Sequence, residues 1–513
     1  MKNIFKIFLL SFAVVFTSCE DDLDINTDPN SPTQITKGLA LASAEASLVT
    51  VLGGELTNLG GFWAQYHTQS PSASQYEVFD QYNLTTSYAD RLWTELYAGC
   101  LNDLEFVINE AEQDGDTGTV VIATCLKAYT FQLLVDLFDG VPYTEALQGI
   151  DNITPAVTSG EEVYTGLMAE LDAAVAAYEA DPVNGGVGSQ DQIYGGNVAR
   201  WVQFANTLKL KMYIRMAYTS MANPTAVNAL IAEDNFITAD AAFTNFGDSQ
   251  NQRNPFYEVQ IDRLGDVNNV ASNTLRDFYE ANGDMRIQAV YRPSGTNPLN
   301  FPSISQGTGN DFNNTAASYG RPNIWPKTPV FLMSMAESNF LQAEALIRYA
   351  AGAGAQVKYD NGVLQSFLTY ANYFEKDNDL TDADENLEPV FSVADATAAA
   401  TALTGAGGAY EYNATGDTET LLRQVMIQKW ASLPYVNNIE AYIEATRTKF
   451  PEVVPEGTED YSMGNRIPSA ISTLPNVQIP SILFYPDDEV NRNPNITQHN
   501  SLTDNVWWDQ KTE

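Results

Sequence analysis

Residues 87–145 read SYADRLWTELYAGCLNDLEFVINEAEQDGDTGTVVIATCLKAYTFQLLVDLFDGVPYTE, and this stretch decides the fold. Between residues 92 and 111 apolar side chains recur every three or four positions, which is the spacing of an apolar stripe on a helix. Residues 114–116, Asp-Gly-Asp, are typical of a turn. The apolar pattern then returns over residues 120–138. We therefore expect two antiparallel helices joined by a short turn.

A helical hairpin of this size cannot bury both of its faces alone, so it needs further helices packed against it, as in helical-repeat proteins. Similar apolar patterns predict those helices elsewhere in the chain. They are expected at 38–54, 161–179, 197–221, within 222–240, and at 330–350, 362–374, 418–432 and 435–446. Gly53 and Gly54 are interpreted as the end of the first of these.

Residues 245–328 have a different composition, rich in Asn, Gly, Pro, Ser and aromatic residues. An unbroken structureless loop of this length is unusual, so we expect a partly ordered, loop-rich insertion with a few short strands. The resulting expectation is a mainly α fold. Its helical-repeat scaffold covers 38–244 and 329–448, its insertion covers 245–328, and its tail, 449–513, wraps the surface.

The charge of the chain excludes some classes of partner. The 513 residues include 65 acidic and 26 basic residues, for a formal net charge of −39. Nucleic acid and anionic lipid surfaces repel such a protein, so neither is an expected partner. A neutral ligand or a protein partner is compatible with this charge.

The N-terminus has the features of a targeting segment. Lys2 and Lys6 precede an apolar run over residues 7–16 that is too short for a permanent membrane span. The following residues, 16–19 (FTSC), resemble a bacterial lipoprotein signal in which Cys19 is acylated and becomes the first mature residue. The acidic residues after Cys19 resemble the surface-export signal of Bacteroidetes lipoproteins.

This reading divides the chain into a signal peptide at 1–18, an acidic lipid-anchored tether at 19–37 and a single domain at 38–513. Loss of residues 1–18, which carry two lysines and no acidic residue, changes the net charge from −39 to −41. We find no later apolar run that reads as a membrane span, so the lipid is the expected anchor. Cys100 and Cys125 lie one on each helix of the hairpin. They either pair across the helices or, as we expect, remain two buried thiols.

Two stretches, 62–82 and 319–327, combine aromatic rings with amide and charged groups. Sugar binding needs flat apolar faces for the rings and planar polar groups for the hydroxyls. The candidate ligand residues are Trp63, Tyr66, Gln69, Tyr76, Tyr82, Tyr319, Arg321, Asn323 and Trp325. The alternative is that these rings, Trp63 and Trp325 above all, anchor loops to the helices. For any single ring this alternative is favoured.

Enzymatic signals are few. The chain has two histidines, His67 and His499, which argues against a zinc site rich in histidine and against a nucleophile assisted by histidine. It lacks the G-x-S-x-G and P-loop motifs. A pair of carboxylates for glycoside hydrolysis stays open, because 65 acidic residues offer many pairs. We expect no cofactor, and a structural calcium ion among loop carboxylates stays open.

Several sequence blocks together resemble one known family. In chain order they are the 19–30 region with LDIN at 23–26, FDGVPYTEAL at 138–147, IYGGN at 193–197, FANTLKL at 204–210, MAESNFLQAEA at 335–345, QKW at 428–430, IEA at 439–441, RTKFP at 447–451, RIP at 466–468 and YPDDE at 485–489. Each block is weak alone, but the ordered series is similar to the SusD/RagB family of nutrient-binding outer-membrane lipoproteins.

The resemblance implies a tetratricopeptide-like helical layer carrying a loop-rich, aromatic face. It also implies a protein of the outer membrane that faces the cell exterior and acts as a lid on a SusC-type TonB-dependent transporter. Many members bind glycans and some bind peptides, and the family has no catalytic residues to carry over. We therefore expect capture of an oligosaccharide or polysaccharide and its delivery to the transporter, without catalysis. A peptide-binding member, a surface glycosidase and a purely structural transporter subunit are the alternatives.

Overall fold

The computed structural model describes residues 35–309, 313–377, 386–455, 461–475 and 478–511. The signal peptide predicted at 1–18, the lipid attachment site Cys19 and nearly all of the tether predicted at 19–37 lie outside these residues. The expectations for them remain predictions.

The hairpin expected over residues 87–145 is present. Its first arm consists of α5 (Asp90–Thr94), a π-helical turn (Glu95–Leu101) and α6 (Asn102–Asp114), and its second arm is α7 (Thr117–Phe138). Gly115 ends α6 in the left-handed conformation, with φ 68°, as a glycine at a helix C-terminus does. Asp116 then caps α7 by accepting a hydrogen bond from the Thr119 backbone N–H at 3.1 Å. The turn prediction is confirmed.

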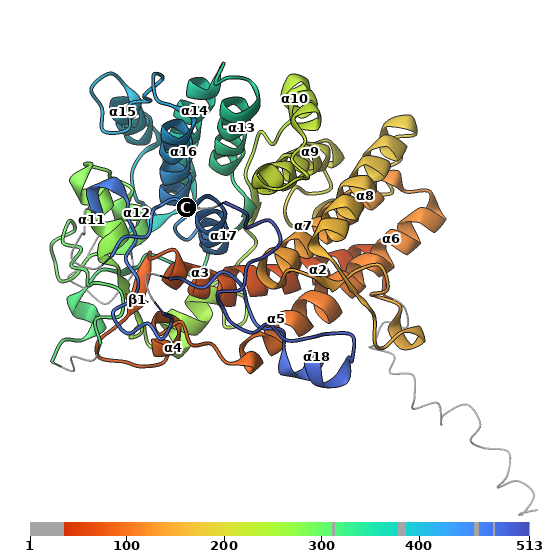
Figure 1. Ribbon diagram of the computed structural model, residues 1–513, viewed down its shortest axis with the longest axis horizontal. Coiled ribbons are helices and arrows are strands. Elements are labelled where there is room, and N and C mark those ends of the chain that lie inside the picture. The colour runs from red at the N-terminus through yellow and green to blue at the C-terminus, as the bar shows by residue number, and fades with distance from the viewer. Residues whose placement is uncertain (1–34, 310–312, 378–385, 456–460, 476–477, 512–513) are drawn as a thin grey trace, which may run out of the picture.

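Further helices pack on this hairpin and on one another, so the mainly α prediction is confirmed. They are α8 (Gly160–Ala180), α9 (Val198–Arg215), α10 (Pro224–Glu233), α13 (Met335–Tyr349), α14 (Ala355–Tyr373), α15 (Val393–Thr404), α16 (Thr418–Ser432) and α17 (Asn438–Thr448). Helix α7 packs on α6, α8 and α9, and α13 packs on α14 and α16. Figure 1 shows these stacked pairs, a tetratricopeptide-like arrangement, across the right and upper parts of the molecule.

The first long helix does not end at its two glycines. It consists of α2 (Lys37–Thr50), a π-helical turn (Val51–Leu56) and α3 (Thr57–Trp63). A Cβ atom on Gly53 would lie 2.3 Å from Val330 Cγ2, and one on Gly60 would lie 2.5 Å from the Ile439 backbone nitrogen. These glycines therefore serve close packing, and the predicted end at Gly53 and Gly54 is wrong.

Two described helices, Lys37–Trp63 and Thr117–Phe138, are long and apolar enough to cross a membrane by length and composition. The expectation that no such run follows the signal peptide was too strict. More than half of the most apolar window in each helix is buried inside the protein. Both are therefore core helices of the scaffold, and their hydropathy reflects burial on several faces.

The described strands are short and pair in five antiparallel two-stranded sheets. The pairs are β1 (His67–Gln69) with β5 (Asn269–Ala271), β2 (Val141–Pro142) with β3 (Val157–Thr158), β4 (Ala241–Phe243) with β8 (Val330–Met333), β6 (Tyr291–Arg292) with β7 (Arg321–Pro322), and β9 (Glu375–Asp377) with β10 (Leu387–Pro389). The β1–β5 pair fastens the loop after α3 to the insertion.

The insertion predicted at 245–328 is loop-rich with short strands, as expected. It also contains a π-helical turn (Tyr257–Arg263), α11 (Asn273–Ala281) and α12 (Ile287–Val290). In Figure 1 the α11 and α12 end of the molecule lies at the left, beside α4 (Glu77–Asp80) and β1. The aromatic loop and the insertion therefore share one face.

The tail does more than wrap the surface. It includes the short helix α18 (Asp487–Arg492), and Figure 1 shows it crossing the middle of the molecule. The side chains of Ile482, Leu483, Val506 and Trp508 are buried in the main core. The Trp508 indole N–H donates to Asp136 Oδ1 on α7 at 2.8 Å. The tail is thus part of the core, which corrects the expectation of a surface wrap.

A network of buried charges joins α7, α9, α13, α16 and α17 inside the scaffold. We call it the buried ion network; its members are Lys211, Arg215, Arg348, Lys429 and Arg447 with Asp136, Glu337, Glu344, Glu440 and Glu444. Each of the five cations has a carboxylate oxygen within 3.1 Å. Equal numbers of the two signs face each other.

Glu440 illustrates how the network holds its charges. Burial raises the pKa of this carboxyl group, but Arg215, Lys211 and Lys429 together hold its pKa down at about 2. Lys211 Nζ lies 2.8 Å from Glu440 Oε2, and Lys429 Nζ lies 3.1 Å from Oε1. A buried carboxylate with several cationic partners stays ionised at neutral pH.

The two cysteines of the hairpin are free and buried. Cys100 Sγ lies 3.5 Å from Thr130 Oγ1, and Cys125 Sγ lies 3.5 Å from the Trp201 carbonyl oxygen. Burial raises the pKa of both thiols well above the ordinary range of a cysteine. The expectation of two buried thiols is confirmed.

Candidate ligand-binding site

Most of the residues proposed from sequence as ligand contacts are inside the protein. Trp63, Tyr66, Gln69, Tyr82, Asn323 and Trp325 expose at most 9% of their surface. A ligand does not reach them in this structure, so their assignment as a binding surface is corrected. The alternative stated for these residues, that they anchor loops, is the one the geometry favours.

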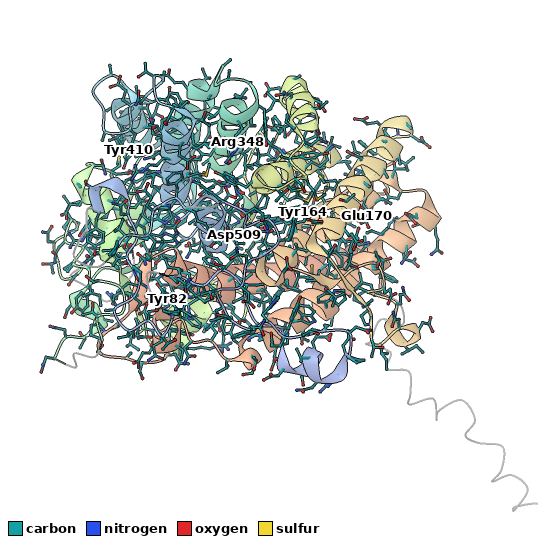
Figure 2. The ribbon with its side chains drawn as sticks, in the orientation of Figure 1. Tyr82, Tyr164, Glu170, Arg348, Tyr410 and Asp509 are labelled. Atoms are coloured by element: carbon teal, nitrogen blue, oxygen red, sulfur yellow. The ribbon has the colours of Figure 1, made fainter. Side chains whose placement is uncertain are left out.

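The buried residues of the first stretch hold the aromatic loop to the scaffold. The Trp63 indole N–H donates to the Phe79 carbonyl oxygen at 3.3 Å, and the Tyr66 hydroxyl donates to the Trp430 carbonyl oxygen. Tyr82 accepts a hydrogen bond from the Ser469 backbone N–H, which joins the loop to the tail. Figure 2 shows Tyr82 at the lower left, near the end of the molecule that carries the aromatic loop. Sequence composition shows rings and amides here, but not the direction in which they point.

The second stretch is anchored in a similar way. The Asn323 side-chain amide donates to the carbonyl oxygens of Ala289 and Glu375, and its Oδ1 accepts from the Trp325 indole N–H at 2.9 Å. Arg321 is only partly exposed and its Nη1 lies 2.6 Å from Asp266 Oδ2. Tyr319 is partly exposed. Tyr319 and Arg321 therefore remain accessible, but neither lines a cavity described below.

Tyr76 differs from these candidates, because it lines a cavity between segments of the described chain. This cavity of about 450 Å³ lies between the middle of the first long helix, the aromatic loop and the start of the insertion. We call it the Tyr76 pocket; its lining is Thr50, Val51, Gly54, Glu55, Asn58, Tyr76, Phe79, Tyr88, Arg91, Asn251, Arg253, Pro255, Glu258, Val259, Gln260 and Arg263. The volume lies within the usual range for small-molecule sites.

Rings form one wall of the Tyr76 pocket. The Tyr76 and Phe79 rings are stacked, with centroids 5.1 Å apart and an angle of 25° between their planes. Tyr88 meets Phe79 edge to face, with centroids 5.5 Å apart. The Tyr76 hydroxyl accepts a hydrogen bond from Gln260 Nε2 at 2.7 Å, which fixes the ring against the insertion. This wall is preorganised by contacts within the protein.

Polar groups form the opposite wall. Glu258 is buried, and its Oε1 lies 3.1 Å from Arg263 Nη2. Gln260 Oε1 is buried and accepts no hydrogen bond from the described residues. A buried amide oxygen without a donor costs free energy until a ligand or water supplies one. The pocket thus offers an acceptor next to the tyrosine rings.

Glu55 has an unusual proton affinity. Burial raises its pKa to about 7, although Arg91 and the Tyr88 hydroxyl act in the opposite direction. This carboxyl group therefore changes charge near neutral pH, whereas an ordinary glutamate is ionised there. Perturbed groups of this kind gather at functional sites more often than elsewhere.

The residues of the insertion that line this pocket were not found from sequence. A signal for them exists in Asn254 followed by Pro255, a pair typical of a helix start. In the structure Asn254 Oδ1 accepts hydrogen bonds from the backbone N–H groups of Phe256 and Tyr257, at 2.9 and 3.1 Å. The helical segment that follows places Glu258, Gln260 and Arg263 at the pocket.

The histidines are structural in the described protein. His67 is fully buried, and its ring nitrogens lie 3.1 Å from the Tyr435 hydroxyl and 3.0 Å from the Asn58 carbonyl oxygen. Burial lowers the pKa of His67 to about 3. Among the described residues, no group of three or more His, Cys, Asp or Glu side chains is arranged to hold a metal ion. The calcium ion left open by the sequence stays an untested prediction.

Comparison with known proteins gives a consistent picture of the fold. A family model for SusD-like proteins, described as starch-binding and associating with the outer membrane, matches residues 29–472. Among curated proteins, none matches the chain significantly in sequence.

Solved structures are similar over nearly the whole chain. A SusD/RagB family protein from Bacteroides thetaiotaomicron superposes with a TM-score of 0.73 at 19% identity, covering 94% of this chain and 100% of that one. A SusD homologue from Bacteroides uniformis has a TM-score of 0.70 at 21% identity, covering 92% and 99%. A chitin-binding SusD homologue from Flavobacterium johnsoniae has a TM-score of 0.70 at 20% identity, covering 92% and 98%.

Proposed function

This chain belongs to the SusD-like family of proteins that associate with the outer membrane, and we propose that it captures a neutral oligosaccharide in the Tyr76 pocket. The pocket itself is the main support for this proposal. Its tyrosine rings offer flat faces to a sugar ring, and the buried Gln260 amide oxygen offers an acceptor to a sugar hydroxyl. The printed descriptions of the family and of one relative, starch-binding and chitin-binding, are in keeping with a glycan ligand.

We further propose that Cys19 carries the lipid anchor, that the protein faces the cell exterior, and that it passes its ligand unchanged to a SusC-type TonB-dependent transporter. The resemblance of residues 16–19 to a lipoprotein signal supports the anchor. The net charge of −39 is consistent with a neutral ligand and with no nucleic-acid partner. Uptake of a labelled oligosaccharide by cells carrying Cys19→Ala tests the anchor, and we expect uptake to be lost.

Calorimetry on the full chain with maltoheptaose and with chitohexaose tests the binding proposal. We expect one of these neutral oligomers to bind with a Kd between about 1 μM and 1 mM, because a partly open pocket buries few ligand atoms. Tyr76→Ala removes the stacked ring and should weaken that binding by about fivefold to thirtyfold, since loss of an aromatic contact with its buried area costs about 1–2 kcal/mol.

Tyr319→Ala is the matched control, because Tyr319 is also partly exposed but lies outside the pocket lining. Its affinity should stay within about twofold of the unchanged protein. Loss of binding in Tyr319→Ala with retention in Tyr76→Ala would move the site to the second aromatic stretch. Binding of short peptides and of neither oligomer would favour the peptide-binding alternative on the same scaffold.

A second candidate function is glycoside hydrolysis, and one observation favours it. Glu55, with a pKa of about 7, shares the pocket with Glu258, whose carboxylate is paired with Arg263. A protonated carboxyl group and an ionised one are the pair that hydrolysis of a glycosidic bond requires. Release of shorter sugars from either oligomer, abolished by Glu55→Gln, would establish hydrolysis. Intact oligomers after prolonged incubation would support binding alone.

A further inference from the structure

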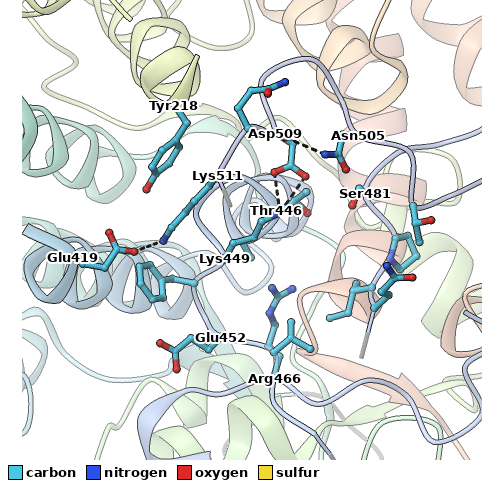
Figure 3. A pocket seen from close by; sticks show the side chains of 18 of the residues that line it. Tyr218, Glu419, Thr446, Lys449, Glu452, Arg466, Ser481, Asn505, Asp509 and Lys511 are labelled. Carbon is cyan, nitrogen blue, oxygen red and sulfur yellow. Dashed lines mark hydrogen bonds and ion pairs between the residues drawn. The ribbon is translucent and has the colours of Figure 1, made fainter. Parts of the chain in front are cut away.

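A second and larger cavity, of about 970 Å³, lies where the C-terminal end of α17 meets the tail (Figure 3). We call it the Arg466 cavity. It shares no lining residue with the Tyr76 pocket. An inference about it therefore does not rest on the proposed function.

Arg466 is the feature that distinguishes this cavity. Four arginines among the described residues are buried: Arg215, Arg286, Arg447 and Arg466. The first three each have a carboxylate oxygen within hydrogen-bonding distance. Arg466 has none within the described part of the chain, and its guanidinium donates to the carbonyl oxygens of Pro451 and Trp63, at 3.1 and 3.5 Å.

The direction of the Arg466 side chain is a second observation, beside the absence of a carboxylate partner among the described residues. In Figure 3 the Arg466 guanidinium points from below toward Lys449 and Thr446, into the space of the cavity. Burial lowers its pKa to about 10, which nearby tyrosines only partly offset. At neutral pH the group still carries a full positive charge. A buried cation without a counter-ion is costly, and an anion placed against it removes that cost.

The other charged groups at this cavity are already paired. Lys449 Nζ lies 2.8 Å from Asp509 Oδ1, and Lys511 forms an ion pair with Glu419. Glu452 faces Arg423 on α16, with Glu452 Oε1 3.5 Å from Arg423 Nε. One positive charge, that of Arg466, is therefore left over. A single carboxylate balances it, whereas a doubly charged phosphate would leave excess negative charge in a buried place.

The rest of the lining suits a sugar. Ile479 and Pro480 offer apolar surface, and Ser481, Asn505 and Gln510 offer hydrogen-bonding groups. The planar guanidinium matches the two oxygens of a carboxylate in a bidentate arrangement. We propose that the Arg466 cavity binds an acidic saccharide, with the carboxylate of a uronate unit against the Arg466 guanidinium.

The experiment compares galacturonate with its methyl ester, which lacks the single negative charge and carries one extra methyl group, by calorimetry on the full chain. We expect the acid to bind and the ester to bind at least about tenfold more weakly, because the ester cannot make the charged bidentate contact. Arg466→Met should reduce the affinity for the acid to that of the ester. Tyr76→Ala should leave the preference for the acid unchanged, which separates this inference from the proposed function.

Arg466→Met is expected to fold, since it removes a buried charge and strands no carboxylate among the described residues. Circular dichroism checks this. If the variant does not fold, Gln510→Glu takes its place, because Gln510 is exposed at the cavity and the new carboxylate repels an acid but not an ester. Equal binding of acid and ester, no binding of the acid, or an unchanged preference in the folded variant would overturn the proposal.

Discussion

The buried ion network and the Tyr76 pocket differ in whether their charged and polar groups have partners within the protein. In the network every cation has a carboxylate within 3.1 Å, and the side chains of Arg215, Arg447 and Glu344 are fully buried. In the pocket Glu55 has a pKa of about 7, and the buried amide oxygen of Gln260 accepts no hydrogen bond from the described residues. The network pairs its charges within the protein, while the pocket leaves a polar group for a ligand to pair.

The sequence blocks that carry the family resemblance belong to one of these two regions. The sequence blocks at 335–345, 428–430, 439–441 and 447–451 supply Glu337, Glu344, Lys429, Glu440 and Arg447 to the network. The residues that line the Tyr76 pocket lie in none of the quoted blocks. The blocks therefore identify the scaffold, and they carry no information on the ligand of the Tyr76 pocket.

The largest expected effect comes from breaking the network. Arg447→Met removes a guanidinium group that lies 2.7 Å from a carboxylate oxygen of Glu344 and 2.8 Å from one of Glu444. Glu344 keeps Arg348 and Glu444 keeps Lys429 as partners, but the network is left with one excess negative charge, which we expect to cost about 3–5 kcal/mol in the free energy of unfolding. Urea unfolding followed by circular dichroism measures this loss.

Arg492→Met is the matched control. Its ion pair with Asp488 has a similar geometry, at 3.2 Å, but both side chains are more than two-thirds exposed. An exposed pair of this kind contributes about 0.5 kcal/mol or less, because water screens it. Equal destabilisation by the two substitutions would mean that burial does not distinguish the network from surface pairs.

The scaffold could be predicted from sequence because its signals are local. Apolar spacing located the hairpin, and the turn at 114–116 supplied its connection. The prediction that the first helix ends at Gly53 and Gly54 was wrong. Sequence does not distinguish a glycine that ends a helix from one that lets another segment pack closely against the helix. Gly53 admits Val330, a contact between segments far apart in the chain.

The site could be predicted only in part, for a related reason. An aromatic loop is visible in sequence, but the direction of each ring depends on the elements it packs against. Trp63 packs against Tyr442 of α17, with ring centroids 5.0 Å apart, whereas Tyr76 faces the insertion through Gln260. Both contacts join distant parts of the chain, so spacing within the loop does not separate an anchor from a ligand contact.

A smaller effect should follow from pH, through Glu55. The folded pKa of about 7 exceeds the ordinary value of 4.5, so the folded protein binds more protons than the unfolded chain between these two values. Its contribution to stability is fully present below about pH 4.5 and is lost as pH rises through 7. We expect the stability of Glu55→Gln, relative to the unchanged protein, to rise by about 2–3 kcal/mol between pH 5 and pH 8.

Urea unfolding of both proteins at the two pH values provides the measurement. Other groups, such as Asp80 with a pKa raised to about 6 by burial, titrate equally in both proteins and cancel in the difference. If the two proteins differ in unfolding free energy by the same amount at pH 5 and at pH 8, the pocket does not hold Glu55 in its protonated form.

Hydrogen–deuterium exchange tests most directly whether ligand capture is confined to the Tyr76 pocket. Exchange is followed by mass spectrometry in the full chain, with and without whichever of maltoheptaose and chitohexaose binds more tightly. We expect slower exchange in the segments 70–91 and 251–263, with no change in α13, α16 and α17, where the network already holds the backbone. Protection confined to other segments, with 70–91 and 251–263 unchanged, would contradict the assignment of the Tyr76 pocket as the site of capture.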